Sequence, residues 1–289
     1  MSSLLTYALI QAFLVQRKTA SVKDWLQVHS ATVWIVPTYL EQESKYPHMR
    51  YYVCPPFDAQ SSNYLVNLLH QADVSYPQRK IVGSHRFQES LLQDNLVTLC
   101  LPQRNQYARI ILGIYSQIYT YHQDPETAAT LAALYANDTL CKEEYFGLKW
   151  APLKLEDGGE IQEWKIRHFG RQANASQAWY GSDINAHPDE NIHIPGRENS
   201  DYALVVKGPN PFNPAATVLV VCGIHGIGTL GGALFLYQRS QELYRLYPAR
   251  GQVHLIEVRY SVKPHGDNYV DSEILTLKCL HYQPLPERF

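Results

Sequence analysis

The run VLVVCGIHGIGTLGGALFLYQ at residues 218–238 constrains the fold more than any other part of the chain. A continuous apolar stretch meets a cluster of glycines, and these glycines open an amphipathic helix. Such an apolar stretch indicates a strand buried on both faces, as in a parallel sheet covered by helices. The glycines indicate a tight turn from that strand into the helix. We therefore expect residues 216–262 to form strand, helix, strand, with the first strand near the sheet centre.

The same alternation of apolar strands and helices occurs upstream, over residues 31–137. This alternation is typical of a mostly parallel sheet with helices on both faces. We predict an α/β fold with a doubly wound, mostly parallel, Rossmann-like sheet at residues 31–289, after an N-terminal helical segment at 1–30. Residues 138–200 are polar and rich in Gly and Asn, which predicts an irregular insertion with candidate strands at FGLKWAPL and EWKIRHF. Within it, we expect residues 155–200 to be the least ordered internal segment or a lid over the cleft.

The composition of the chain argues against several kinds of binding partner. The net charge is −2 and the sequence contains no cluster of basic residues, so direct binding to nucleic acid is not expected. The N-terminal apolar stretch is too short to span a bilayer, so no membrane partner is expected. HPDENIH at residues 187–193 indicates an exposed loop, and we expect no metal site. The 5 cysteines form no CxxC pair, which favours a reducing, cytoplasmic setting.

The glycine turn has two interpretations. Gly226, Gly228 and Gly231 fit G-x-G-x-x-G between a strand and a helix, where backbone amides can hold a phosphate. The same glycines can instead serve only a tight turn and close packing. Glu257 is the candidate acid for a ribose, but it lies in the middle of the next predicted strand. His225, within the turn, is suited to contact a ligand, exchange a proton or cap the backbone.

Two further turns carry polar side chains. In LPQRN, Arg104 is suited to bind an anion, and Asn105 either contacts the ligand or caps the next helix. In KGPNPFNP, Asn210 and Asn213 either form a wall of the ligand pocket or satisfy their own backbone in a rigid turn. Turns from both halves of the chain suit a crevice at a topological switch point.

The string DYALVVKGPNPFNPAATVLVVCGIHGIGTLGGA resembles a segment shared by poorly characterised bacterial Rossmann-like proteins, with the pattern PNPFNP…GxHxxGTxG. NLVTLCLPQRN and PPFDAQSSNYLVNLL resemble upstream parts of the same family, so the likeness touches about residues 50–110 and 200–260. The resemblance implies a Rossmann-like fold and a link to signalling or regulatory proteins, including defence systems.

These features favour a nucleotide-sensing or signalling module that passes its signal through a protein partner or a homodimer. One alternative is a nucleotide-processing enzyme of the nucleosidase or NAD glycohydrolase type, with Asp58 or Glu257 as its carboxylate. Another is an adaptor with an empty cleft. The sequence leaves open whether the chain is an enzyme, assigns no catalytic residue and suggests only a nucleotide as ligand. The ligand-binding candidates are Arg104, Asn105, Asn210, Asn213, Gly223, His225, Gly226, Gly228 and Glu257.

Overall fold

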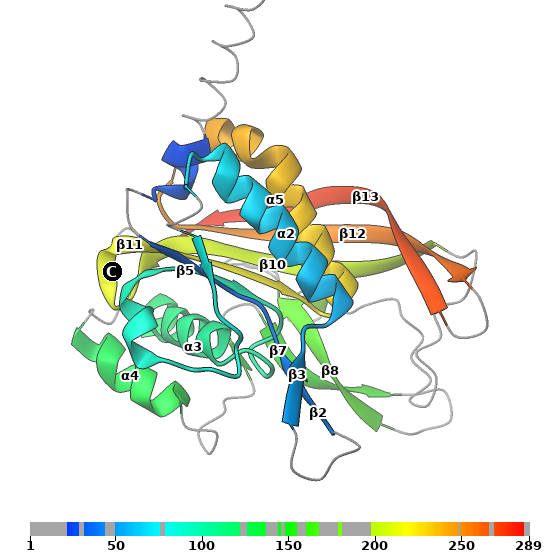
Figure 1. The fold of residues 1–289 in the computed structure, drawn as a ribbon, viewed down its shortest axis with the longest axis horizontal. Helices are drawn as coiled ribbons and strands as arrows, with labels where there is room; N and C mark the ends of the chain where they lie inside the picture. Colours follow the sequence, from blue (N-terminus) through cyan, green and yellow to red (C-terminus); the bar gives the residue numbers. More distant parts are fainter. Residues whose placement is uncertain are drawn as a thin grey trace, which may run out of the picture.

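The computed structural model describes the ranges 22–28, 32–43, 50–75, 79–121, 126–136, 144–145, 148–154, 160–167, 179–180, 198–247, 249–265 and 269–285. Its central sheet is built from β1 (Val33–Val36), β4 (Arg79–Ile81), β5 (Asn95–Leu99), β10 (Glu198–Asn210), β11 (Asn213–Gly223), β12 (Gln252–His265) and β13 (Tyr269–Pro284). The strand order is β13-β12-β10-β11-β5-β1-β4 (Figure 1). The expectation that the strand before the glycine turn lies near the sheet centre is confirmed, since β11 is fourth of the 7 strands.

The helices are α2 (Pro56–Gln71), α3 (Gln106–Tyr121), α4 (Glu126–Ala136) and α5 (Gly226–Leu246), with a 3₁₀ helix, η2 (Glu89–Gln93). A short helical turn also covers residues 22–26, whereas the helix expected at the start of the chain lies outside the described residues. A two-stranded sheet pairs β2 (Leu40–Glu43) with β3 (Arg50–Val53) between β1 and α2. The described helices include none with the length and apolar character needed to cross a lipid bilayer.

The central sheet is mixed, with a parallel block and an antiparallel block. β4, β1, β5 and β11 run parallel to one another. β10, β12 and β13 add antiparallel pairings, which the prediction of a mostly parallel sheet did not include. The reason is the short turn between Asn210 and Asn213, which leaves no room for a crossover and therefore reverses the chain. β12 still runs parallel to β11, because β10 lies antiparallel to both.

Helices cover both faces of this sheet, as Figure 1 shows. Val205 and Val221 pack in one apolar cluster with residues of α2 and α5. Their neighbours Val206 and Val220 pack in a second cluster with residues of α3 and α4. This alternation follows from the two-residue period of a strand, and it explains why the strands are apolar on both faces.

The parallel block contains a change of direction in its winding. From β1 the chain passes through α2 to β4 on one side of β1, and then returns to β5 on the other side. α3 follows β5 on the sheet face opposite to α2. The starts of α2 and α3 therefore follow neighbouring strands at the same end of the sheet. We call this end, where Val36, Leu99 and Gly223 finish their strands, the carboxyl edge.

The segment predicted as an irregular insertion contains an antiparallel sheet of β6 (Glu144–Tyr145), β7 (Leu148–Lys154), β8 (Glu160–Arg167) and β9 (Trp179–Tyr180). The two strands expected at FGLKWAPL and EWKIRHF are confirmed as β7 and β8. The remainder of residues 138–197 lies outside the described residues, so the expectation of a mobile segment or lid stays a prediction. The division into segments 1–30 and 31–289 also stays a prediction.

Candidate functional site

Glycines at the end of β11 and within α5 are required because neighbouring groups approach them closely. A Cβ on Gly223 would collide with the backbone of the following turn, and its amide donates to the Thr229 hydroxyl at 2.9 Å. A Cβ on Gly232 would lie 2.9 Å from Ala203 Cβ and from Val221 Cγ1. α5 therefore lies against the sheet at a distance that admits no side chain at these positions.

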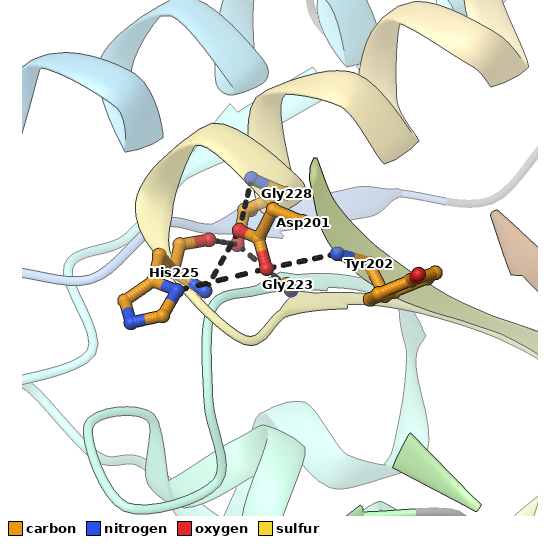
Figure 2. A network of polar contacts seen from close by, with 6 residues as sticks. Asp201, Tyr202, Gly223, His225 and Gly228 are labelled. Atoms are coloured by element: carbon orange, nitrogen blue, oxygen red, sulfur yellow. Dashed lines mark hydrogen bonds and ion pairs between the residues drawn. The ribbon is translucent and has the colours of Figure 1, made fainter. Parts of the chain in front are cut away.

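Asp201 of β10 supplies the anion at the start of α5 (Figure 2). Its carboxylate is fully buried, and Oδ2 accepts hydrogen bonds from the amides of His225 at 3.1 Å and Gly228 at 2.9 Å. Oδ1 accepts from the amide of Tyr202 at 2.8 Å. A helix N-terminus favours a negative charge, and here the chain itself provides that charge. The Gly228 amide, a predicted phosphate contact, therefore already has an anionic partner.

His225 lies beside the same carboxylate. It is the N-cap residue of α5, and its Nδ1 lies 3.6 Å from Asp201 Oδ1. The His225 side chain is 37% exposed, whereas that of Asp201 is fully enclosed. Figure 2 shows the Nδ1 side of the ring turned toward Asp201 and the other ring nitrogen on the far side. The pair therefore combines a buried carboxylate with an imidazole that reaches solvent.

Asp58 is a second buried carboxylate at the carboxyl edge. It lies in the first turn of α2, is 2% exposed, and its Oδ2 has no hydrogen-bond partner among the described residues. The buried Thr38 hydroxyl, just past β1, lies beside this carboxylate and lowers the pKa of Asp58 by hydrogen bonding, although neither Thr38 Oγ1 nor Asp58 Oδ2 makes a hydrogen bond of good geometry within those residues. A buried polar atom without a well-formed hydrogen bond costs about 1–3 kcal/mol. A bound group at this place would complete the hydrogen bonding of Oδ2.

The environment of Asp58 changes its acidity. Burial raises the pKa of its carboxyl from 3.8 to about 6, while hydrogen bonds from Thr38 and Cys100 and the positive charge of Arg104 oppose part of that rise. Burial and the Asp58 charge in turn raise the pKa of the Cys54 thiol to about 11. Asp58 therefore exists in both protonation states near neutral pH, whereas Cys54 stays a thiol.

The turn after β5 forms another wall of the edge. Cys100 has a φ of 75°, in the left-handed region that residues with a side chain rarely adopt. Cys222 on β11 donates its S–H to the Cys100 carbonyl at 2.9 Å. Strained backbone of this kind is concentrated at functional sites. The strain redirects the chain from β5 toward Arg104, which is exposed and lies within electrostatic reach of Asp58.

Asn105 has a structural role at this edge. Its Nδ2 donates to the carbonyls of Val36 and Leu99, both at 2.9 Å, and so ties the ends of β1 and β5 together. Its Oδ1 accepts from the amides of Tyr107 and Ala108, which caps α3. Asn105 is fully buried, so the helix-cap alternative describes its observed contacts.

Three predicted site residues lie elsewhere. Asn210 and Asn213 lie at the turn at the opposite end of β11. The side-chain Nδ2 of Asn210 donates to the carbonyls of Leu92 and Asp94. The side-chain Nδ2 of Asn213 donates to the carbonyl of Gln93. The structure therefore does not bring them together with His225, because β10 and β11 form a hairpin. Glu257 on β12 pairs with Arg259 at 3.4 Å, and its register neighbour is Tyr202. Since Asp201 is the residue before that neighbour, Glu257 and Asp201 lie on opposite faces of the sheet.

Asp201 and the strained backbone at Cys100 were not predicted from the sequence. A signal for Asp201 was present, because an acid at the start of an apolar strand has to find a buried partner. Within the described ranges no three His, Cys, Asp or Glu side chains gather as a metal site, and residues 187–193 lie outside those ranges. No protein-family model, curated protein or solved structure matches the chain. The resemblance to bacterial Rossmann-like proteins therefore stays a prediction from the motif.

Proposed function

We propose that the chain is a doubly wound, Rossmann-like module that binds a nucleotide-like small molecule at the carboxyl edge, between the starts of α2 and α3. The observation that carries this proposal is the buried carboxylate of Asp58, whose Oδ2 makes no hydrogen bond of good geometry among the described residues, at the point where the winding reverses. Ligands of open α/β sheets bind outside the carboxyl ends of the strands at such a switch point. A ligand hydroxyl donating to Asp58 would supply the missing hydrogen bond.

Arg104 extends this arrangement to the anionic part of a nucleotide. It is exposed, follows β5 directly and lies within electrostatic reach of Asp58. A guanidinium binds phosphate through paired, charge-assisted hydrogen bonds. In this proposal Asp58 binds the sugar hydroxyls and Arg104 binds the phosphate. The sensing and signalling role implied by the motif, with a protein partner or a second copy as receiver, forms part of the same proposal.

The test is calorimetric binding of adenosine, AMP, ATP, NAD, ADP-ribose and cyclic AMP to the unmodified chain and to Asp58→Asn. Asn keeps the shape of the side chain and removes the charged acceptor. We expect at least one compound to bind, and Asp58→Asn to weaken it tenfold or more, because a hydrogen bond to a charged group contributes about 1.5–3 kcal/mol. Asn213→Ala, at the opposite end of β11, is the matched control and should bind normally.

The proposal fails if none of the compounds binds, or if Asp58→Asn binds them as tightly as the unmodified chain while its melting transition shows an intact fold. Binding that Asn213→Ala also weakens would place the ligand away from the carboxyl edge.

A second candidate function is a nucleotide-processing enzyme of the nucleosidase or NAD glycohydrolase type. The observation that favours it is the pKa of Asp58, raised by burial to about 6, because acid–base chemistry works best with a group poised near the working pH. The assay is chromatographic detection of free base or nicotinamide after incubation with nucleosides or NAD. Release that persists unchanged in Asp58→Asn would assign the activity to another group or a contaminant.

A further inference from the structure

The loops that follow β1 and β4 are hydrogen-bonded to each other at the carboxyl edge. The amide of Ser84 donates to the Pro37 carbonyl at 3.1 Å, and the Ser84 hydroxyl accepts from the amide of Tyr39 at 3.1 Å. Tyr39, from the loop after β1, therefore lies beside His85, from the loop after β4, with ring centroids 5.3 Å apart.

A third ring comes from the β2–β3 hairpin. Tyr52 of β3 stacks on His85, with ring centroids 4.0 Å apart and an interplanar angle of 12°. Gly83 leaves room for these rings, because a Cβ there would lie 2.5 Å from His85 Cε1 and 2.9 Å from Tyr39 Cδ2. We call Tyr39, Tyr52 and His85 the aromatic cluster. Three separate segments of the chain thus bring their rings to one place.

The aromatic cluster adjoins Asp58 through two short stretches of chain. Thr38, which lies beside the Asp58 carboxylate, directly precedes Tyr39. Burial and the Asp58 charge raise the pKa of the Cys54 thiol, and Cys54 lies two residues after Tyr52. Two such residues of an extended chain are about 7 Å apart. Two joined parts of one small ligand can therefore reach both Asp58 and the cluster.

His85 supports the Tyr52 ring and leaves part of it open to solvent. Tyr52 is 39% exposed, whereas His85 is partly buried. Burial and the charge of Arg86 lower the pKa of His85, so its ring is neutral at pH 7. A neutral imidazole stacked on the phenol ring restricts the orientation of that ring. The result is a flat aromatic surface, held in place before any ligand arrives.

We propose that Tyr52, supported by His85, is the stacking surface for the base of the nucleotide that Asp58 and Arg104 bind. This inference rests on the proposed function and names the part of the ligand that the aromatic cluster recognises. Stacking uses the flat face that every base has, so the surface should accept more than one base.

The first experiment compares AMP with ribose 5-phosphate, which lacks the base, by calorimetry. We expect ribose 5-phosphate to bind the unmodified chain about fivefold or more weakly than AMP, which is the lower end of what base stacking contributes. Tyr52→Ala should weaken AMP by a similar factor and leave ribose 5-phosphate unchanged. Tyr52→Phe keeps the ring and should bind AMP within about twofold of the unmodified chain.

Tyr51→Ala is the matched control. Tyr51 is the preceding residue of β3, is 47% exposed and lies on the other face of the strand, so this variant should bind AMP normally. Equal losses in Tyr51→Ala and Tyr52→Ala would overturn the inference, because the loss would then come from the hairpin as a whole.

The second experiment detects the stack directly. The fluorescence of 2-aminopurine riboside 5′-monophosphate is quenched when its base stacks on an aromatic ring. We expect quenching on binding to the unmodified chain and to Tyr51→Ala, and much weaker quenching in Tyr52→Ala at saturating protein. Binding to the unmodified chain without quenching, or unchanged quenching in Tyr52→Ala, would overturn the inference.

The outcomes separate the two proposals. If the unmodified chain binds AMP and ribose 5-phosphate equally, and Asp58→Asn weakens both, the inference alone fails. It also fails alone if AMP does not bind while another compound of the panel binds in an Asp58-dependent way. Both comparisons hold even where Tyr52→Ala does not fold. If no compound binds, the proposed function fails and this inference fails with it.

Discussion

Replacing Asp201 with Ala should destabilise the protein more than the loss of an ordinary surface carboxylate. The change removes the acceptor for the amides of His225 and Gly228, both 24 or more positions away along the chain. A hydrogen bond to a charged group contributes about 1.5–3 kcal/mol, and a charge at a helix start adds about 0.3–1 kcal/mol. Because the hydrogen bond of the His225 amide is only partly buried, water can replace the carboxylate there in the variant, and we take the lower end of this range. The expected loss in the free energy of unfolding is about 3–4 kcal/mol.

The assay is urea denaturation followed by tryptophan fluorescence, with three variants compared. Asp201→Asn retains one oxygen acceptor, so it should lose about half as much as Asp201→Ala. Glu257→Gln is the matched control, because this acid lies on the opposite sheet face and pairs only with the exposed Arg259 among the described residues. It should change stability by less than about 0.5 kcal/mol. A loss below about 1 kcal/mol for Asp201→Ala would refute the reasoning, since the two amides would then not depend on this carboxylate.

Gly231→Ala places a methyl group against Val258 and should lower the free energy of unfolding by about 1–3 kcal/mol. Adding Val258→Ala should recover part of that loss in a double-mutant cycle. Strictly additive losses would contradict this packing. The pKa of Asp58 is higher in the folded chain (about 6) than in the unfolded chain (3.8), so the folded state binds more protons between these values and stability falls as pH rises through them. The Asp58→Asn variant should therefore be more stable than the unmodified chain by up to about 3 kcal/mol at pH 7, and no more stable at pH 3.5. A stability difference that does not change with pH would show that the carboxyl of Asp58 is not its source. Burial lowers the pKa of Lys207 from 10.5 to about 7, so the unfolded chain binds more protons between these values and stability should rise with pH across that window. Lys207→Met should remove this rise in equilibrium denaturation series, and an unchanged slope would exclude Lys207 as its source.

Most helices and strands could be predicted because apolar periodicity reports burial directly. The run from Val218 to Gly223 is apolar on both faces and proved to be a central strand, β11. The direction of its neighbour could not be predicted in the same way. β10 is also buried on both faces, and burial is the same whether a strand runs parallel or antiparallel. Only the short turn at Asn210–Asn213 distinguishes the two arrangements, and we left open whether that turn was rigid backbone or a pocket wall without using it to assign the direction of β10.

The positions of some candidate site residues in the fold could be predicted, whereas their binding role stays a proposal. Arg104 and His225 were expected at the same edge because polar residues follow apolar strands, and parallel strands end at one edge. Asp201 was missed because local rules look for a cap beside the helix, and here the cap residue is His225. The capping carboxylate comes from a separate strand, 24 residues earlier. The raised pKa of Asp58 depends on the burial of its side chain at the start of α2, which no local sequence pattern encodes.

The β10–β11 turn has a consequence for residues roughly 35 Å away, the length of an 11-residue strand. The hairpin pairs Lys207 with Leu219 and Ala203 with Gly223, so counting from the turn determines which residue of β10 stands beside the start of α5. A slip of one residue would move Asp201 to the other face of the sheet and leave α5 uncapped. The hydrogen bonds from Asn210 to the carbonyls of Leu92 and Asp94 therefore help to fix the register of the hairpin. Inserting or deleting one residue in that turn should therefore separate Asp201 from His225, although neither residue is changed.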